Sequence, residues 1–324
     1  MGTEIVDVAV IGARGHTGAE LLRLLDGHPN FRIAAVSSRA LVGKAVRDEV
    51  AGGLRTDAVF ADLEPADVAA HAGVGVWVLA LPNGLAAPWV AAIDEHAPDS
   101  VIVDLSADYR FDSAWTYGLT EMNRKWLLGA RRVANPGCYA TGAQLALLPV
   151  IELLDGAPHV FGVSGYSGAG TTPSPRNDPE QLRDNLMPYS LVGHTHEQEI
   201  RWHLGHRVFF MPHVAPFFRG ITLTISMPLG EPIARGELLE RYRQRYQAEP
   251  LVDVIDEAPL VRDAANRHGV TLGGLTIDPA ERHAVVVSTL DNLLKGAATQ
   301  AMQNMNLACG FDELAGIRQH LVAR

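Results

Sequence analysis

The sequence predicts two domains, a doubly wound α/β domain with a parallel sheet and an α+β domain with a mainly antiparallel sheet. Short β-branched runs alternate with amphipathic helices over residues 1–137, whereas residues 138–292 hold many strands and few helices. The length of 324 residues, with 47% hydrophobic and 20% charged, suffices for two cores. We assign residues 1–137 and 293–324 to the first domain and residues 138–292 to the second.

The first domain opens with a strand, a glycine turn and a helix. The strand is expected at Ile5–Ile11, and Thr17–Leu25 places its leucines on one helical face. The alternation continues with strands at Arg32–Ser37, Val74–Leu81 and Ser100–Leu105, and with a helix at Ala86–Glu95. Nearly continuous apolar strands separated by helices predict a parallel sheet that is covered on both faces.

The pattern changes after Cys138. Helices are expected at Ala140–Leu154 and Gly236–Gln247, and a last helix at Leu293–Leu307 is expected to return to the first domain. Strands are expected at His159–Val163, Val208–His213, Gly220–Met227, Val270–Ile277 and Ala284–Leu290. Because only one convincing helix lies among the later four strands, the sheet should be mainly antiparallel. The loop over residues 165–179 is rich in Gly and Pro and has the character of a functional loop.

Composition narrows the function classes. The 27 Lys and Arg against 37 Asp and Glu give a net charge of −10, which argues against nucleic acid or an anionic membrane as the main partner. Two cysteines, Cys138 and Cys309, are too few for a disulfide framework and favour a reducing cytoplasm. No stretch approaches the roughly 20 apolar residues of a membrane span, and no secretory leader is recognisable, so we expect a soluble protein.

A glycine-rich turn follows the first strand. Glycines spaced three apart let the backbone approach a pyrophosphate at a helix N-terminus, although an ordinary strand-to-helix turn is the alternative. An NAD site would carry an acidic residue after the second strand, whereas this chain has hydroxyl and basic side chains that suit the 2′-phosphate of NADP, or else form a solvated loop. The candidate cofactor residues are Gly12, Arg14, Gly15, His16, Thr17, Gly18, Ser37, Ser38, Arg39 and Lys44.

Cys138 lies at the expected entry of a helix. The helix dipole and the unpaired N–H groups there favour a thiolate, and Pro136 and Gly137 permit a tight turn that leaves the sulfur exposed. We therefore interpret Cys138 as a nucleophile, against the alternative of a small buried side chain, which is how we interpret Cys309.

His194 and His196, with Glu199 close behind, form a second cluster. Histidines two apart point the same way on a strand but not on a helix, and one of them could shuttle a proton for the cysteine. A metal site is disfavoured because no further ligands occur at recognisable spacing, so no metal is predicted. Surface or satisfied polar histidines are the alternative.

Two arginines have surroundings that suit an anionic substrate. Arg110 ends the segment DLSADYR, and Arg219 lies among proline, phenylalanine and glycine in PHVAPFFRG. A guanidinium presents a planar fork that matches carboxylate or phosphate, whereas surface solvation is the alternative.

These motifs resemble the N-acetyl-γ-glutamyl-phosphate reductases of arginine biosynthesis, in the semialdehyde dehydrogenase superfamily. The resemblance covers nearly the whole chain and rests on the glycine turn followed by AELLRLL, SSR, LPNG, DLSADYR, NPGCYAT, SGYSGAG, HTHEQEI, PHVAPFFRGI and DNLLKGAATQAMQNMN. It implies NADPH-dependent reduction of an N-acylated glutamyl phosphate to its semialdehyde, with release of phosphate. A homodimer or homotetramer is expected.

The resemblance also implies roles for individual residues. Cys138 is the nucleophile, His194 the acid/base group, and His196 lies beside it. Further cofactor residues are Leu81, Pro82, Ser167, Gly168 and Asn292, and the substrate residues are Ser106, Arg110, Asn135, Ser164, Gly165, His213 and Arg219, with Ser167 also near the phosphate region. Two departures occur: Asn83 replaces a common histidine, and Thr171–Thr172 replaces a common basic residue, which leaves Arg176 as an alternative phosphate contact.

The chemistry agrees with these assignments, because a thioester accepts a hydride whereas a free acid does not. The sequence leaves open whether the acyl group is acetyl or succinyl, and which histidine transfers the proton. Sister enzymes acting on aspartyl phosphate or on a carrier-bound aminoadipyl phosphate are rivals. A non-catalytic NADP-binding sensor with a regulatory cysteine is a rival of another class.

Overall fold

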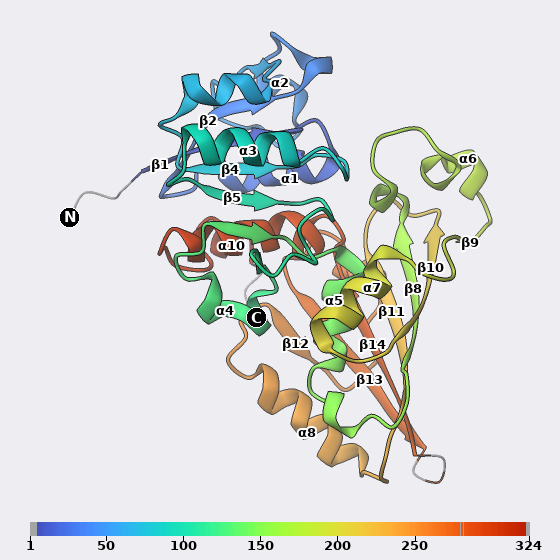
Figure 1. Cartoon of the computed structure of the whole chain (residues 1–324). Helices are drawn as coiled ribbons and strands as arrows, with labels where there is room; N and C mark the ends of the chain where they lie inside the picture. Colours follow the sequence, from blue (N-terminus) through green and yellow to red (C-terminus); the bar gives the residue numbers. More distant parts are fainter. Residues whose placement is uncertain (1–4, 279, 281, 322–324) are drawn as a thin grey trace. The chain divides into compact units, whose positions relative to one another are not determined.

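The chain folds into two compact units, which the computed structural model describes over residues 5–278, 280 and 282–321 (Figure 1). The first unit comprises Met1–Pro136 and Ala297–Arg324, and the second comprises Gly137–Gly296. Each unit is built around its own sheet of seven strands. The chain therefore leaves the first unit once and returns to it near its C-terminal end.

The first unit contains a parallel sheet with the strand order β3-β2-β1-β4-β5-β7-β6. Every neighbouring pair in this sheet is parallel, which confirms the prediction for the first domain. The order β3-β2-β1-β4-β5 is that of dinucleotide-binding folds of the Rossmann type. The strands are β1 (Val6–Ile11), β2 (Phe31–Ser37), β3 (Phe60–Ala61), β4 (Val76–Leu79), β5 (Val101–Asp104), β6 (Thr116–Tyr117) and β7 (Arg132–Ala134).

Helices cover both faces of this sheet. On one face Trp89 and Ile93 pack in an apolar cluster with Ile11, Trp77 and Ile102 of the strands. Helices α1 and α10 contact each other and pack against β2 and β5 respectively. The helices of this unit are α1 (His16–Leu25), α2 (Val46–Glu49), α3 (Ala87–His96), α4 (Thr120–Leu127) and α10 (Thr299–Ala308). The carboxyl ends of the strands thus form the edge where such a fold binds its ligand.

The second unit contains a mixed sheet with the order β12-β13-β14-β11-β8-β10-β9. Four neighbouring pairs are antiparallel, but β8 and β10 are parallel, as are β12 and β13. The expectation of a mainly antiparallel sheet is therefore met only in part. The strands are β8 (His159–Gly165), β9 (Met187–Pro188), β10 (Phe209–Ala215), β11 (Ile221–Pro228), β12 (Val252–Val254), β13 (Val270–Asp278) and β14 (His283–Leu290).

The parallel pair has a clear origin in the connection between its strands. Helix α7 (Thr195–Leu204) lies between β8 and β10 along the chain, and a helical crossover is the usual link between parallel strands. The sequence analysis placed no helix between these two strands, although His194, His196 and Glu199 were noted there. The prediction of the sheet erred for that reason.

Helices cover one face of the second sheet. Helix α5 packs against β11 and β14, where a side chain on Gly142 would meet Leu223 and Leu290, and the Tyr242 hydroxyl of α8 donates to the Ala146 carbonyl at 2.6 Å. The expected helix Ala140–Leu154 is too long, because Pro149 lacks an N–H and disfavours helix in the preceding residue. The helices are α5 (Cys138–Leu147), α6 (Pro179–Leu182), α7, α8 (Arg235–Tyr246) and α9 (Val261–Ala264).

Short helical turns complete the chain. The expected helix Leu293–Leu307 is divided into a π-helical turn at Leu294–Ala298 and helix α10. The 3-10 turns are Arg39–Leu41, Pro65–His71, Ile151–Leu153, Tyr166–Ala169, Pro175–Asn177 and Arg318–His320. Among the described helices, none combines the length and the apolar character that crossing a membrane requires.

His28 joins the loop after α1 to helix α10. Its Nδ1 accepts hydrogen bonds from the main-chain N–H groups of Asn30 and Phe31, at 3.1 and 3.0 Å. The Nε2 atom therefore carries the proton of the neutral ring and donates to Asn306 Oδ1 at 3.1 Å. Burial lowers the pKa of His28 below its ordinary value of 6.5, although hydrogen bonds to Ala315 and Asn306 partly oppose this.

We expect acid to destabilise the first unit through His28. With a lowered pKa in the folded state, the unfolded chain binds more protons below about pH 6.5, so the free energy of unfolding falls as the pH falls. Thermal unfolding of the wild type and of His28→Gln, followed between pH 5 and 8, measures this effect. The variant should be less stable at neutral pH and should depend less on pH; parallel profiles would contradict the assignment.

Candidate active site

The glycine turn after β1 has two glycines that the fold itself requires. Gly12 has a φ of +81°, and a Cβ on it would collide with the Ala80 carbonyl. A Cβ on Gly18 would lie 2.7 Å from the backbone of Ala13. Gly15 is different, because it begins α1 with an ordinary φ of −64° and the nearest atom to its Cβ position is 3.9 Å away. Packing does not explain this glycine, whereas a phosphate approaching the helix N-terminus would.

The end of β2 carries the residues predicted to recognise a 2′-phosphate. Ser37 and Ser38 are buried, and the Ser37 hydroxyl accepts from the Leu63 N–H at 3.4 Å. Arg39 is exposed and pairs with Glu64 and with Asp62, and Lys44 pairs with Glu49 at 2.9 Å. The cations are therefore present, but each already has a carboxylate partner with which a phosphate would compete.

The turns after β4 and β5 are joined by hydrogen bonds. Leu81 and Pro82 begin the first turn, and the Asn83 side chain accepts from the Ala107 N–H at 3.0 Å. The Asp108 carboxylate accepts in return from the Gly84 N–H at 2.7 Å. Asn83, which departs from the family pattern, thus has a structural role at the carboxyl edge of the sheet.

Three predicted substrate residues of the first unit are buried and bonded to their own unit. The Ser106 hydroxyl donates to Asp104 at 2.7 Å, and burial raises the pKa of that carboxyl group. Arg110 Nε donates to the Asn135 carbonyl at 2.9 Å, and Asn135 Oδ1 accepts from Asn304 at 2.9 Å. These contacts hold the chain just before Pro136 and Cys138, so Ser106, Arg110 and Asn135 are suited to positioning that turn.

In the second unit, Cys138 is the first residue of α5 and is partly exposed. The preceding N–H, that of Gly137, donates to the buried Glu199 carboxylate of α7 at 2.8 Å. A Cβ on Gly296 would lie only 2.7 Å from the Cβ of Cys138. The cysteine is therefore fixed between α7 and the π-helical turn, at a helix N-terminus where a thiolate is favoured.

The sequence left open whether His194 and His196 lie on a strand or on a helix; they lie at the start of α7. His194 is the N-cap residue, and its Nδ1 accepts from the His196 N–H at 3.0 Å. The two ring centroids are nevertheless 4.9 Å apart, and that of His196 is 5.7 Å from the ring of Tyr139. The capping turn brings together two imidazoles that a regular helix would separate.

The electrostatics of His194 favour a neutral ring. Burial lowers its pKa, as does the charge of Arg176, while Glu199 and Glu197 act in the opposite direction. Because Nδ1 accepts a hydrogen bond, the proton of the neutral ring lies on Nε2. His194 is thus set up as a hydrogen-bond donor through Nε2.

His213 is not part of this cluster. Along β10, Phe210 packs its ring 5.3 Å from that of His194, whereas the His213 ring lies 4.6 Å from that of Phe161. Positions 210 and 213 of a strand point to opposite faces, so the His213 ring lies on the other face of the sheet from His194, and the substrate contact expected for His213 stays a prediction. The main-chain carbonyl of His213 does contact the cluster, because it accepts a hydrogen bond from the Tyr139 hydroxyl at 2.8 Å.

The SGYSGAG loop after β8 is bonded to the segment that ends with Asn292. The Asn292 side chain donates to the Ser167 hydroxyl at 2.9 Å and accepts from the Gly220 N–H at 2.7 Å. Ser164 bonds to the Gly165 carbonyl at 2.9 Å, and Gly165 lies too close to the backbone of Phe218 for any side chain. Gly168 is exposed, with the Ser164 hydroxyl 2.8 Å from its Cβ position.

Arg219 is held by its own unit on two sides. Its Nε lies 2.7 Å from the fully buried Asp291 carboxylate, and its Nη1 donates to Asn266 at 2.6 Å. Asp291 also accepts from the N–H of Leu293 at 2.8 Å. The guanidinium therefore orders the turn that leads to Gly296, which favours a positioning role.

The side chains around Cys138, here called the cysteine cluster, are Cys138, Tyr139, Tyr189, His194, His196 and Glu199. The sequence analysis gave no role to three of them. Glu199 was noted without a role, and Tyr139 and Tyr189 were not considered. The Tyr189 ring lies 5.5 Å from that of His194. Tyr139 directly follows Cys138 in the sequence, so its place in the cluster could have been predicted. Tyr189 is distant from Cys138 in the chain, and only the fold brings it close to His194.

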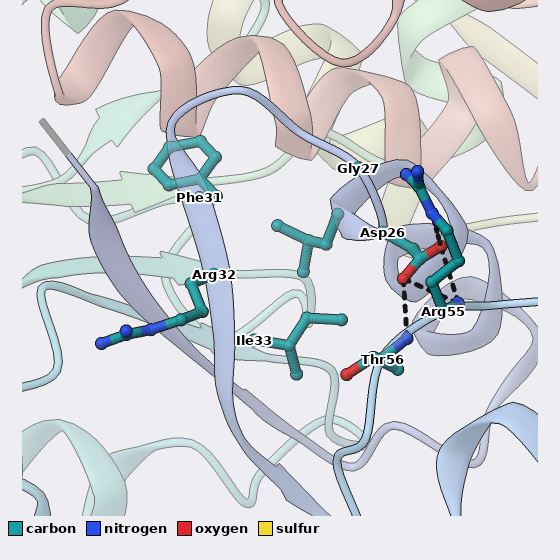
Figure 2. A pocket seen from close by; sticks show the side chains of 8 residues that line it. Asp26, Gly27, Phe31, Arg32, Ile33, Arg55 and Thr56 are labelled. Atoms are coloured by element: carbon teal, nitrogen blue, oxygen red, sulfur yellow. Dashed lines mark hydrogen bonds and ion pairs between the residues drawn. The ribbon is translucent and has the colours of Figure 1, made fainter. Parts of the chain in front are cut away.

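No group of three or more His, Cys, Asp or Glu side chains that could hold a metal ion occurs within residues 5–278, 280 and 282–321. A hollow of about 420 Å³ occurs in the first unit, between the end of α1 and the start of β2 (Figure 2). There the Asp26 carboxylate accepts from the N–H groups of Arg55 and Thr56 at 3.0 Å. Because this hollow lies at the amino edge of the sheet, opposite the glycine turn, it is not the cofactor site.

Two family profiles together match most of the chain. Residues 7–130 match the profile described as "Semialdehyde dehydrogenase, NAD binding domain", and residues 138–292 match "Semialdehyde dehydrogenase, dimerisation domain". A protein named N-acetyl-gamma-glutamyl-phosphate reductase from Xanthomonas axonopodis pv. citri is 54% identical over 96% of this chain and 98% of its own length. The chain belongs to the N-acetyl-gamma-glutamyl-phosphate reductase family. It is therefore an oxidoreductase of the semialdehyde dehydrogenase group.

Other relatives of this reductase family agree. The protein of the same name from Stenotrophomonas maltophilia is 54% identical over 98% of this chain and 99% of its own length. The protein named arg-6, mitochondrial, from Neurospora crassa is 51% identical over 96% of this chain, which corresponds to 36% of that longer protein. The family sequence thus also occurs as a part of a larger polypeptide.

Solved structures share the fold at low sequence identity. Aspartate semialdehyde dehydrogenase II from Vibrio cholerae, complexed with ASA, has a TM-score of 0.77 at 18% identity and covers 95% of this chain and 99% of its own. The enzyme from Candida albicans with NADP has a TM-score of 0.74 at 17% identity, over 94% of this chain and 99% of its own. At this identity the likeness establishes the Rossmann-like domain and the mixed-sheet domain, and nothing more.

Proposed function

We propose that this protein reduces N-acetyl-γ-glutamyl phosphate with NADPH to N-acetylglutamate semialdehyde and phosphate, through a thioester on Cys138. The observation that carries the mechanism is the cysteine at the N-terminus of α5, tied through Gly137 and Glu199 to the helix that bears His194 and His196. A thiolate, two imidazoles and a buried carboxylate on adjacent helices form the constellation that acyl transfer to sulfur requires. The family relationship supplies the acylglutamyl substrate.

In the first half-reaction, the Cys138 thiolate attacks the γ-carbonyl carbon of the substrate. The new C–S bond forms and the C–O bond to phosphate breaks; phosphate departs with the bonding pair and takes a proton from solvent. Negative charge develops on the carbonyl oxygen, and the Nε2–H of neutral His194 donates to it. Stabilisation of such a charge by a positioned donor contributes about 10²–10³ in rate.

For the second half-reaction, bound NADPH would supply the hydride that reduces the thioester on Cys138. The resulting oxyanion collapses, the C–S bond breaks, and its electron pair returns to the Cys138 sulfur as thiolate. The aldehyde is released without net consumption of a protein proton. His196 completes the site, with its ring centroid 4.9 Å from that of His194.

The cofactor is NADP. We infer that it binds to the first unit, Met1–Pro136 with Ala297–Arg324, and that the second unit, Gly137–Gly296, is the catalytic and dimerisation domain; these bounds differ by one and four residues from the predicted division after residues 137 and 292. We infer that the pyrophosphate lies over Gly15 at the start of α1, with Arg14, His16 and Thr17 around it. The 2′-phosphate then draws Arg39 and Lys44 away from their carboxylate partners. Leu81 and Pro82 of the same unit lie in the turn after β4. The cofactor contacts expected for Ser167, Gly168 and Asn292 stay predictions.

The predicted substrate residues divide by their contacts. Ser106, Arg110, Asn135 and Arg219 act as positioning residues, because each is already bonded within its own unit. Ser164 and Gly165 shape the loop after β8 within the second unit. Because the reaction needs a reduced thiol, we place the enzyme in the cytoplasm; neither cysteine forms a disulfide.

The assay that tests this function runs the reaction in reverse. Purified protein is given NADP, phosphate and N-acetylglutamate semialdehyde, and NADPH formation is followed, with N-succinylglutamate semialdehyde and aspartate semialdehyde in parallel. We expect phosphate-dependent NADPH formation with the acetyl compound. A preference for aspartate semialdehyde, or NADP binding without any phosphate-dependent reduction, would overturn the proposed function.

We infer a homodimer formed through the sheet face of the second unit that its helices leave uncovered. On this face Met211, Phe161, Thr224 and Val287 stand side by side on four neighbouring strands, and Phe161 is 38% exposed. A partly exposed apolar row on a domain whose family profile is described as a dimerisation domain fits a second copy of the chain.

Light scattering after size exclusion tests this interface. Thr224→Arg places an unpaired charge in the row, so we expect the mass of the particle to fall to that of one chain. Gln244→Arg on the exposed side of α8 is the matched control and should keep the assembly. An unchanged mass for Thr224→Arg would reject this face.

A further inference from the structure

The loop between the SGYSGAG segment and β9 is held in a defined shape by its own side chains. The Asn177 amide donates to the carbonyls of Gly170 and Thr172, at 2.9 and 2.8 Å. Its Oδ1 accepts from the Ser174 N–H at 2.8 Å, and Pro175 begins the 3-10 turn that carries Arg176. The backbone on which Arg176 is mounted is therefore ordered.

Arg176 is directed to the cysteine cluster by Tyr189. Its guanidinium carbon lies 4.9 Å from the centre of the Tyr189 ring, and that ring lies 5.5 Å from the imidazole of His194. Tyr189 is held by its N–H, which donates to the Pro212 carbonyl at 3.2 Å directly after β9. Burial raises the pKa of Tyr189 to about 12, so the phenol ring over which the Arg176 guanidinium packs is neutral.

The charge of Arg176 is not neutralised by a carboxylate. Among the residues that the structure describes, no carboxylate forms an ion pair with the Arg176 guanidinium, and the Arg176 side chain is exposed. Arg183 on the same loop pairs with Glu180 at 2.6 Å, and Arg219 pairs with Asp291 at 2.7 Å. Arg176 is thus the cation of this cluster whose fork is available to a ligand.

We propose that Arg176 binds the phosphoryl group of the acyl phosphate and holds the phosphate as it leaves. This inference rests on the proposed function and deepens it. The phosphoryl group is bonded through oxygen to the carbon that Cys138 attacks, whereas the α-carboxylate of the substrate is separated from that carbon by the α-carbon and two methylene groups. A cation beside the cysteine cluster therefore meets the phosphoryl group, and a planar fork matches its oxygens.

The role of Arg176 follows from the bond changes of the first half-reaction. As the C–S bond forms and the C–O bond breaks, the bonding pair moves onto the departing phosphate, whose negative charge increases. The guanidinium stabilises that charge without donating its proton, because it stays protonated at all relevant pH values. In the reverse direction the same contact captures inorganic phosphate for attack on the thioester.

Kinetics in the reverse direction test the proposal. For Arg176→Met we expect the KM for inorganic phosphate to rise about 10- to 100-fold, as expected for loss of hydrogen bonds to a charged group, with a smaller rise for Arg176→Lys. The Kd for NADP, from fluorescence titration, should stay unchanged. Arg183→Met removes an arginine of the same loop that is paired with Glu180, and it should leave the KM for phosphate unchanged.

The pH profile supplies a second readout. Removal of the Arg176 charge should raise the pKa of His194 and move the acid limb of the kcat profile to higher pH, whereas Arg183→Met should not. The charged and titratable groups facing His194 are Arg176, Glu197, Glu199, His196, Tyr139 and Tyr189. An unchanged KM for phosphate in Arg176→Met, with an active wild type, overturns this inference alone. A wild type without phosphate-dependent NADP reduction overturns the proposed function.

Discussion

Cys138→Ser loses the reduction of acyl phosphate by about 10⁴-fold or more and still binds NADP. The hydroxyl of serine remains protonated at the N-terminus of α5, so it neither attacks the γ-carbonyl carbon nor leaves from the later intermediate as a thiolate would. The magnitude follows other enzymes in which a covalent nucleophile is removed. The fold should tolerate the change, because serine is no larger than cysteine beside Gly296.

Cys309→Ser is the matched control for this variant. Cys309 ends helix α10 in the first unit and is also partly buried, but it lies outside the cysteine cluster. Its activity should stay within about threefold of the wild type, a change of less than 1 kcal/mol in activation free energy. Mass spectrometry of wild type quenched with the acyl substrate should detect an adduct on Cys138. Near-normal turnover by Cys138→Ser would end the covalent mechanism.

His194→Asn lowers kcat by about 10²–10³ while the fold keeps its stability. Asparagine is a good N-cap residue, so its side-chain oxygen can still accept from the His196 N–H that Nδ1 of His194 holds at 3.0 Å. What it loses is the Nε2–H donor, which we assign to the carbonyl oxygen of the substrate. A cap-preserving variant therefore separates the two roles of this histidine.

His194→Ala provides the comparison. It loses both the donor and the cap, so it should show the same fall in kcat and in addition a loss of about 1 kcal/mol in the free energy of unfolding. Thermal or urea unfolding measures the second effect, and steady-state kinetics the first. If His194→Asn kept wild-type kcat and only His194→Ala were impaired, the imidazole would be a helix cap and the catalytic assignment would be wrong.

Some features of the protein followed from local sequence. The parallel sheet of the first unit was predictable because runs such as IVDVAVI and VWVL are short, apolar and separated by helical patterns. The position of Cys138 at the start of a helix was predictable because Pro136 and Gly137 favour a tight turn directly before it. In these cases the information lies within about ten residues of the feature.

The arrangement of the cysteine cluster was decided by tertiary structure. His194 and His196 come together because His194 caps a helix, whereas a two-residue spacing by itself aligns side chains only on a strand. The parallel pairing of β8 with β10 depends on α7, whose apolar periodicity is weak because charged residues such as Glu197 and Glu199 occupy its buried face. The placement of Tyr189 and Arg176 beside His194 requires β9 to pair with β10.

The sequence by itself determined which chemical groups this protein carries and which local turns present them: the thiol at a helix start, the glycine turn after β1 and the cations after β2. Only the tertiary structure decided which of those groups are available to ligands. In the sequence, Arg110, Arg219 and Arg176 are equally plausible anion contacts. In the structure, Arg110 is bonded to the Asn135 carbonyl and Arg219 is paired with Asp291. Arg176 is not paired with a carboxylate among the described residues. The physical reason is that a guanidinium's role depends on its nearest acceptors, and these come from residues distant in the chain.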